Sequence, residues 1–202
     1  MTGIVCLLAC GVLALFGCAP RVLKVLHLNR LGAALWIAAA LVAMTLPEFS
    51  LGGVVLAPWL LVAAAFAVYL VSFGRPQQWW LSLFAMVVAA WVWVAVWAFA
   101  PGLMLTLPAE ADTLLGAVIG LLAIVAALGS LKEAVSGAIL GVVAGEVVYQ
   151  LWQGDLAPLA LDNTLILAAL VPIVGIGAAQ FIRERLRRRE RDLPMTQAVE
   201  PI

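Results

Sequence analysis

Seven long runs of apolar residues limit what this chain can fold into more strictly than any other feature of its sequence. A helix of about 20 apolar residues crosses the hydrocarbon core of a bilayer, which is about 30 Å thick. Soluble domains carry charges on about 25% of their residues, whereas 11% of this chain is charged and 66% is hydrophobic. This balance excludes a water-soluble globular domain, a disordered chain and a disulfide-rich secreted module.

The apolar runs predict an all-α polytopic membrane protein, in which seven transmembrane helices form one bundle over residues 1–182. A β-barrel is excluded, because its strands alternate polar and apolar residues over about ten positions and these runs are apolar throughout. The predicted spans are residues 2–19, 31–46, 51–73, 79–100, 114–128, 134–152 and 164–182. Pro58 and Pro172 lie inside two of these spans, and we expect each to kink its helix.

The distribution of charge predicts how the seven spans are oriented. All eleven basic residues fall in the first, third and fifth connections and after the last span. The charged residues of the second, fourth and sixth connections are all acidic. Basic loops stay in the cytoplasm, so the amino terminus is predicted to lie outside and the carboxyl terminus inside. A chain with six or eight spans would scatter these charges over both faces of the membrane.

The tail that follows the last span, residues 183–202, begins with a basic cluster. We expect the last helix to continue into this cluster and the stretch from Leu193 to Ile202 to be disordered. Basic residues beside a membrane contact anionic lipids and contribute about 1 kcal/mol each, and this interpretation is favoured over nucleic-acid binding. The predicted lipid contacts are Arg183, Arg185, Arg187, Arg188, Arg189 and Arg191.

The sixth span carries a row of glycines at every fourth position, Gly137, Gly141 and Gly145. Such a row forms a groove without side chains, into which a second helix packs at close backbone approach. Gly116 and Gly120 have the same spacing in the fifth span, which makes that span the candidate partner. Packing between these two spans within one subunit is favoured over a seam between two copies of the chain.

Glu146 follows the glycine row and is the one charged residue in the interior of any predicted span. An acid at membrane depth costs about 2–3 kcal/mol on insertion scales. Gln150 lies one turn further along the same helix face and Tyr149 lies three residues away, so the three residues form a candidate polar site. Two interpretations stay open. Glu146 is a functional group, either a proton or cation site or a contact with a polar group of another protein, or it is a protonated acid whose hydrogen bonds serve only helix packing.

Sequence motifs for enzymes and cofactors are missing from the chain. There is no glycine-rich phosphate loop, metal-binding histidine pair or nucleophile elbow, and the chain has one histidine, His27. We therefore predict no catalytic residues, no cofactor and no bound metal. Trp93 and Trp97 lie one turn apart in the fourth span, and we interpret them as packing or lipid-facing residues.

The stretch Leu140–Tyr149 resembles a glycine-glutamate-x-x-tyrosine element of the YphA-like family, small multi-pass membrane proteins of spore-forming Firmicutes. The length near 200 residues, the basic first loop ending at Arg30 and the charged tail also resemble that family. At 100–103, where the family element would carry an acid and an aromatic residue, both are missing. The resemblance implies a bacterial inner-membrane protein linked to sporulation, of no established activity.

Two functional hypotheses follow from these features. The first is a non-enzymatic scaffold or accessory subunit that docks other transmembrane helices, or a second copy, through the glycine groove, with Glu146 as a specificity contact. The alternative is a small proton-coupled transporter or permease in which Glu146 takes up and releases the proton, with Tyr149 and Gln150 as its neighbours.

Overall fold

The computed structural model describes residues 2–16, 20–51, 54–74, 76–103, 111–153 and 162–192. These residues form eight α-helices and one antiparallel hairpin of two short strands, which confirms the predicted all-α class. The helices are α1 (Thr2–Leu15), α2 (Pro20–Val25), α3 (Arg30–Met44), α4 (Pro58–Ser72), α5 (Pro76–Leu103), α6 (Ala111–Ala126), α7 (Leu131–Gln153) and α8 (Asp162–Asp192), and the strands are β1 (Phe49–Leu51) and β2 (Val54–Leu56). The stretch from Leu193 to Ile202, which we expected to be disordered, lies outside the described residues.

Three of the described helices are long and apolar enough to cross a membrane. The candidate spans are Gln78–Phe99 in α5, Leu131–Trp152 in α7 and Asn163–Gln180 in α8, and the apolar helices α3, α4 and α6 are shorter. With 15 residues, α4 is about 22 Å long at 1.5 Å per residue, less than the hydrocarbon core of about 30 Å. The structure thus supports a membrane protein with three candidate spans, and the seven predicted spans stay a prediction.

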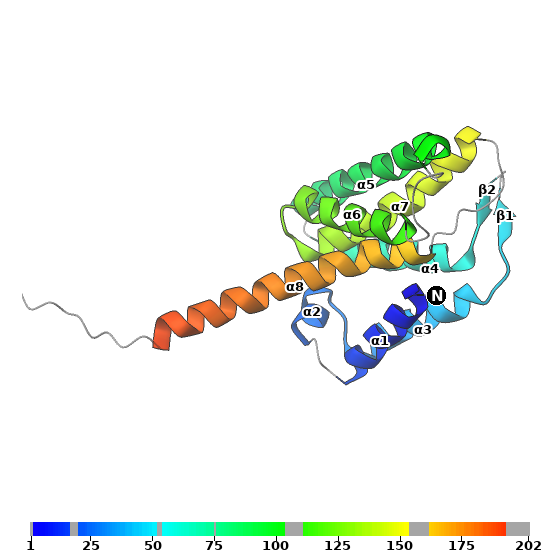
Figure 1. Ribbon diagram of the computed structural model, residues 1–202. Helices are drawn as coiled ribbons and strands as arrows, with labels where there is room; N and C mark the ends of the chain where they lie inside the picture. Colours follow the sequence, from blue (N-terminus) through cyan, green and yellow to red (C-terminus); the bar gives the residue numbers. More distant parts are fainter. Residues whose placement is uncertain are drawn as a thin grey trace, which may run out of the picture.

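α7 lies at the centre of the bundle, where it contacts α4, α5, α6 and α8. It runs parallel to α5, because Gly137 and Gly141 of α7 face Ala85 and Ala89 of α5 in the same order. α8 passes along the bundle and then projects well beyond it toward the carboxyl terminus (Figure 1). The expected continuation of the last helix into the basic cluster is confirmed, since α8 ends at Asp192.

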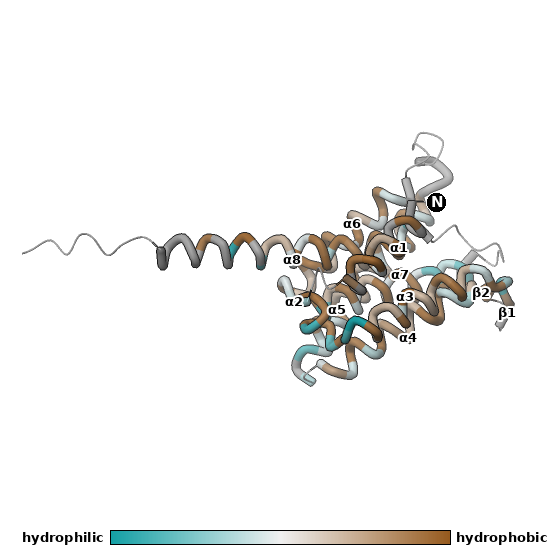
Figure 2. The backbone as a smooth tube through the Cα atoms, turned by 90° about the horizontal axis from the view of Figure 1, so that it is seen from below, coloured by the Kyte–Doolittle hydropathy of each residue, from teal (hydrophilic) through white to brown (hydrophobic). Residues whose placement is uncertain are grey.

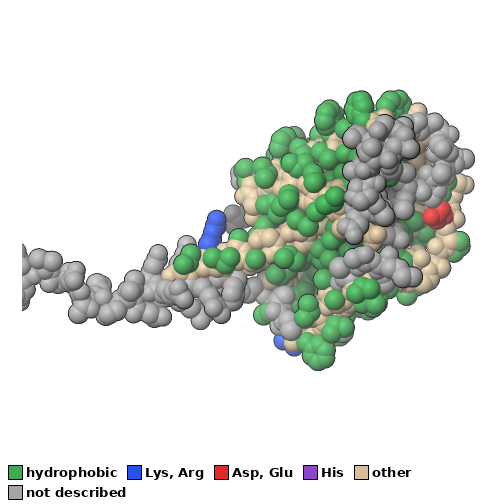
Figure 3. Space-filling view, viewed as in Figure 1, with side chains coloured by type: hydrophobic (Ala, Val, Ile, Leu, Met, Phe, Trp, Pro, Cys, Tyr) green, Lys and Arg blue, Asp and Glu red, His purple; other side chains and the backbone are tan. Residues whose placement is uncertain are grey.

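The bundle has a hairpin end and a tail end. The hairpin end carries β1, β2, the first turn of α4 and the last turns of α7. The tail end carries α2, the last turn of α4, the first turn of α7 and the point where α8 leaves the bundle. In Figure 3 a basic side chain lies near the emerging part of α8 and an acidic one lies at the opposite end. Which end faces the cytoplasm stays a prediction.

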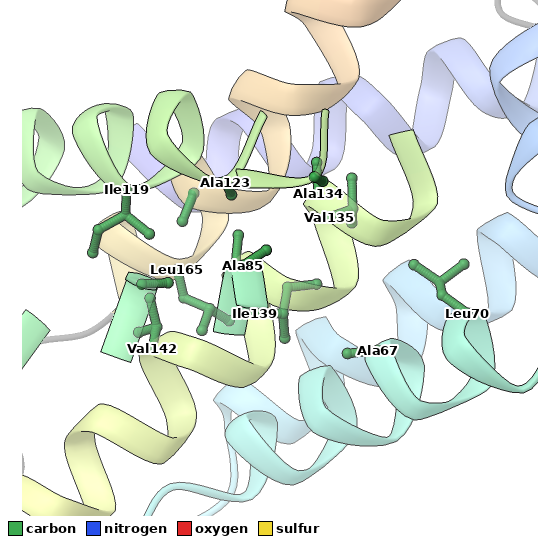
Figure 4. Close-up of a cluster of buried hydrophobic side chains, with 14 of the residues drawn as sticks. Ala67, Leu70, Ala85, Ile119, Ala123, Ala134, Val135, Ile139, Val142 and Leu165 are labelled. Atoms are coloured by element: carbon green, nitrogen blue, oxygen red, sulfur yellow. The ribbon is translucent and has the colours of Figure 1, made fainter. Parts of the chain in front are cut away.

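Small and branched side chains fill the centre of the bundle. Figure 4 shows Ala85, Ala123 and Ala134 among the larger side chains of Ile119 and Ile139. Small residues bring helix backbones close together, which is how helices associate in a bilayer. Hydrophobic residues make up much of the described helices in Figure 2, and exposed hydrophobic side chains are spread over the described part of the bundle face seen in Figure 3. Such a surface suits contact with lipid.

The predicted third span, residues 51–73, is wrong in its first part. Its first residues belong to the hairpin, and α4 begins only at Pro58. Proline lacks a backbone N–H and has a fixed φ, which suits the first position of a helix. Pro58 therefore starts α4 instead of kinking it, whereas Pro172 lies inside α8 as predicted.

A hydrogen bond between two serines links α5 to α7 in the core. The Oγ atoms of Ser82 and Ser136 lie 3.1 Å apart, and both side chains are buried. Polar contacts between membrane helices contribute about 0.6 kcal/mol on average. In a double-mutant cycle of Ser82→Ala and Ser136→Ala, we expect a coupling free energy of that size, measured by unfolding in detergent. Additive effects of the two substitutions would contradict this expectation.

Candidate functional site

Glu146 lies on α7 in the interior of the bundle, with no exposed surface. Its Oε2 accepts a hydrogen bond from Trp93 Nε1 of α5 at 3.2 Å, and its Oε1 accepts one from Gln150 Nε2 at 2.7 Å. Gln150 is one turn further along α7, as the i, i+4 spacing predicted. The structure thus joins Glu146 and Gln150 and adds Trp93 as a third member.

Gln150 connects this buried acid to the hairpin. Its Oε1 accepts a hydrogen bond from the backbone N–H of Val55 at 2.8 Å, and its Nε2 donates to the backbone oxygen of Val55 at 3.0 Å. Val55 belongs to β2, where it pairs with Ser50 of β1. A single amide side chain, itself 2% exposed, therefore bonds both to the acid inside the bundle and to the hairpin at its end.

Tyr149 belongs to an aromatic cluster next to the acid. Its ring centroid lies 6.5 Å from that of Trp97, which in turn lies 5.6 Å from the ring of Trp93. Trp93 has no exposed surface, so its interpretation as a packing residue is confirmed. Within the described part of the chain, Trp97 Nε1 is a buried donor that has no hydrogen-bond acceptor.

The glycine row of α7 packs against α5, and the predicted pairing with the fifth span is wrong. A Cβ placed on Gly137 or Gly141 would lie 2.4 Å from the Cβ of Ala85 or Ala89, respectively. The next glycine, Gly145, faces the Trp93 side chain, to which a Cβ would come within 2.8 Å. The groove is thus filled inside the chain, by a helix that offers small residues at the same spacing.

The glycines of α6 face α8 instead of α7. A Cβ on Gly116 would lie 2.5 Å from the backbone oxygen of Thr164, and one on Gly120 would lie 2.8 Å from Val171. The two glycine rows therefore do not face each other. Each brings its own helix against a helix two places away along the chain, α7 against the earlier α5 and α6 against the later α8.

The predicted lipid-binding cluster lies on the projecting part of α8. Arg183 is exposed on this segment. Arg185, Arg187, Arg188, Arg189 and Arg191 share its helix, but their side chains lie outside the described set. Contact with anionic lipid stays a prediction.

Glu146, its partners Trp93 and Gln150 and the neighbouring Tyr149 form a polar network. This network offers chemistry of one kind, the uptake and release of a proton. A carboxyl group and a phenol exchange protons, whereas the indole of Trp93 and the amide of Gln150 only donate or accept hydrogen bonds. Among the described residues, no group of three or more His, Cys, Asp or Glu side chains could hold a metal ion.

Sequence reasoning missed Trp93 and Val55 as partners of the polar residues. They lie 53 residues from Glu146 and 95 residues from Gln150 along the chain, so helix periodicity carries no signal for either contact. Comparison with family models, with curated proteins and with solved structures finds no match for this chain.

Proposed function

We propose that this membrane protein is a small proton-coupled transporter in which Glu146 carries the proton. The observation that supports this proposal is the Glu146 carboxyl itself, buried inside the bundle and bonded to Trp93 of α5 and Gln150 of α7. A titratable group inside a membrane bundle is costly to keep. Its presence is best explained by a proton that binds and leaves there.

The hydrogen bonds of Gln150 connect the buried acid to the hairpin. Coupled transport needs a link between the protonation of a buried group and the position of a structural element. Gln150 provides such a link, because it bonds to Glu146 and to both backbone groups of Val55. A change at the carboxyl therefore reaches the hairpin through one side chain.

The scaffold hypothesis loses the contacts on which it depended. The groove of Gly137, Gly141 and Gly145 is filled by α5 of the same chain, so it is closed to a helix of another protein. Glu146 has no exposed surface with which to contact a partner. The transporter hypothesis is therefore the one that we carry forward, and the resemblance to the YphA-like family adds the proposal that it works in a bacterial inner membrane.

Proton uptake into liposomes tests this function when a mixture of small solutes, such as amino acids, sugars and inorganic ions, is present on both sides of the membrane, because coupled proton flux needs the transported solute. The purified protein is reconstituted into vesicles that hold a pH-sensitive dye, and a proton gradient is imposed. Wild-type protein is expected to acidify the lumen faster than protein-free vesicles. Glu146→Gln keeps the shape and hydrogen-bonding capacity of the side chain but cannot release a proton, so it is expected to match the protein-free rate.

Glu133→Gln provides the matched control. Glu133 is also a buried acid of α7, but it lies in the first turn, at the tail end of the bundle. There it accepts a hydrogen bond from Ser130, the residue before the helix. We expect this variant to keep the wild-type rate. Equal rates for wild type and Glu146→Gln, or a wild type no faster than empty vesicles, would refute the proposed function.

A further inference from the structure

We propose that the tail end of the bundle carries a binding surface for the headgroups of anionic phospholipids. Its central cations are Lys24 in the last turn of α2, Arg30 at the start of α3 and Lys132 in the first turn of α7. This headgroup surface belongs to the bundle itself and is additional to the arginine cluster on the projecting part of α8. It does not depend on the proton chemistry of Glu146.

Three connections that lie far apart in the sequence meet at this end. The ring of His27, between α2 and α3, stacks on the ring of Phe73 at the end of α4, with centroids 5.3 Å apart. The hydroxyl of Tyr69 donates a hydrogen bond to the backbone oxygen of His27 at 3.0 Å. Lys132 Nζ donates one to the backbone oxygen of Phe73, also at 3.0 Å. These contacts join the connections α2–α3, α4–α5 and α6–α7 into one surface.

α8 leaves the bundle beside this surface. A Cβ placed on Gly177 of α8 would lie 3.7 Å from Val22 Cγ2, so α2 lies against α8 at this point. Arg183 follows six residues later and is exposed, about 9 Å further along the helix at 1.5 Å per residue. The headgroup surface and the first arginine of the tail therefore lie at the same end of the molecule.

The described side chains give this end a positive surface. The cations that are exposed or partly exposed there are Lys24, Arg30, Lys132 and Arg183. The described acid at this end, Glu133, is 3% exposed and so presents almost no carboxylate to the outside. Glu48, the exposed acid among the described side chains, precedes β1 at the hairpin end. Basic residues near a membrane surface attract anionic headgroups, and at this end no described acid on the surface opposes them.

The neighbouring aromatic and apolar side chains favour a lipid over a soluble anion. Trp79 and Trp80, near the start of α5, are 50% and 73% exposed, and tryptophan is enriched where the membrane meets water. Further along the helices the exposed side chains include Leu35 in α3 and Phe84 in α5. A phospholipid matches this order, because its headgroup lies beside the cations while its acyl chains lie along the apolar side chains.

Native mass spectrometry of the full chain in detergent tests the headgroup surface. Delipidated protein is titrated with phosphatidylglycerol, which is anionic, or with phosphatidylcholine of the same acyl chains, which has no net charge. The contribution of the tail is removed by using a background chain in which glutamine replaces Arg185, Arg187, Arg188, Arg189 and Arg191. A basic residue near an anionic membrane surface contributes about a fivefold factor to binding. We therefore expect the background chain to prefer phosphatidylglycerol by at least about 25-fold.

Two exposed cations are then removed from the background chain. Lys24→Gln and Arg30→Gln are each expected to weaken phosphatidylglycerol binding about fivefold, and the double variant about 25-fold. Binding of phosphatidylcholine should not change. Both side chains are exposed, so the lipid-free double variant is expected to unfold at the same temperature as the background chain, which separates loss of lipid binding from loss of the fold.

Ser50→Glu is the matched control for net charge. It changes the net charge by the same amount as Lys24→Gln, but at an exposed position of β1, at the hairpin end. We expect it to keep the lipid affinity of the background chain. Equal binding of the two lipids by the background chain would overturn the headgroup surface, and so would an equal loss in Ser50→Glu and Lys24→Gln. Displacement of phosphatidylglycerol by an equal concentration of glycerol phosphate would also overturn it, because the surface would then bind a soluble phosphate and not a lipid.

Discussion

Replacing Gly141 by alanine is expected to destabilise the folded protein by at least about 2 kcal/mol, as overpacked cores commonly are. The new Cβ would lie 2.4 Å from the Cβ of Ala89 and 2.6 Å from the backbone oxygen of Met86. Both atoms belong to α5, so the two helices must move apart along their closest contact. For a chain of this size the loss corresponds to a fall of about 4–8 °C in the unfolding temperature, measured in detergent.

Gly177→Ala is the matched control for this prediction. Gly177 lies in α8, and the nearest atom to an added Cβ is Val22 Cγ2, at an ordinary contact distance of 3.7 Å. Alanine also favours the helix over glycine by about 1 kcal/mol, so this variant is expected to unfold at the same or a higher temperature. An equal effect of the two substitutions would show that close approach to α5 is not what makes glycine necessary at position 141.

The glycine rows show what sequence periodicity does and does not determine. A repeat of four residues identifies the face of a helix that packs closely, and Gly137 and Gly141 do pack in this way. It does not identify the partner, because any helix with small residues fits such a groove. The partner row in α5, Ala85 and Ala89, lies in a helix rich in small and apolar residues, where two alanines are not distinctive.

The hairpin could not be predicted from hydropathy. Residues 51–73 are apolar enough for one long span, and a short apolar strand has no hydropathy signal that separates it from the start of a buried helix. Pro58 carried the relevant information, since a proline is common at the first position of a helix. The hairpin in turn positions Val55 over Gln150, so the part of the site that joins it to the end of the bundle was missed as well.

The acid and its nearest partner were predicted because both lie on one helix. Glu146 and Gln150 are four residues apart and form the expected hydrogen bond. Trp93 comes from α5, and its part in the network follows from the register of α5 on α7, in which Gly145 lies against Trp93. That register depends on tertiary packing, which no local pattern encodes.

Gln150→Leu is expected to destabilise the protein by about 2–4 kcal/mol, because each buried polar group left without its partner costs about 1–3 kcal/mol. Leucine has a similar size but forms none of the three hydrogen bonds. The N–H and the backbone oxygen of Val55 lose their partner, and Glu146 Oε1 loses a donor. The loss should appear both in the unfolding temperature and as faster hydrogen exchange from Phe49 to Leu56.

Val148→Leu, two residues away on α7, separates this effect from a general disturbance of the helix. Val148 is 52% exposed on the outer face of the bundle, so the change adds one apolar group toward lipid and is expected to leave stability within about 0.5 kcal/mol of wild type. Tyr149→Phe should also have a small effect, since it keeps the ring beside Trp97. If Gln150→Leu were as stable as Val148→Leu and its hairpin exchanged at the wild-type rate, Gln150 would not be what holds the hairpin to α7, and the link from Glu146 to the end of the bundle would be absent.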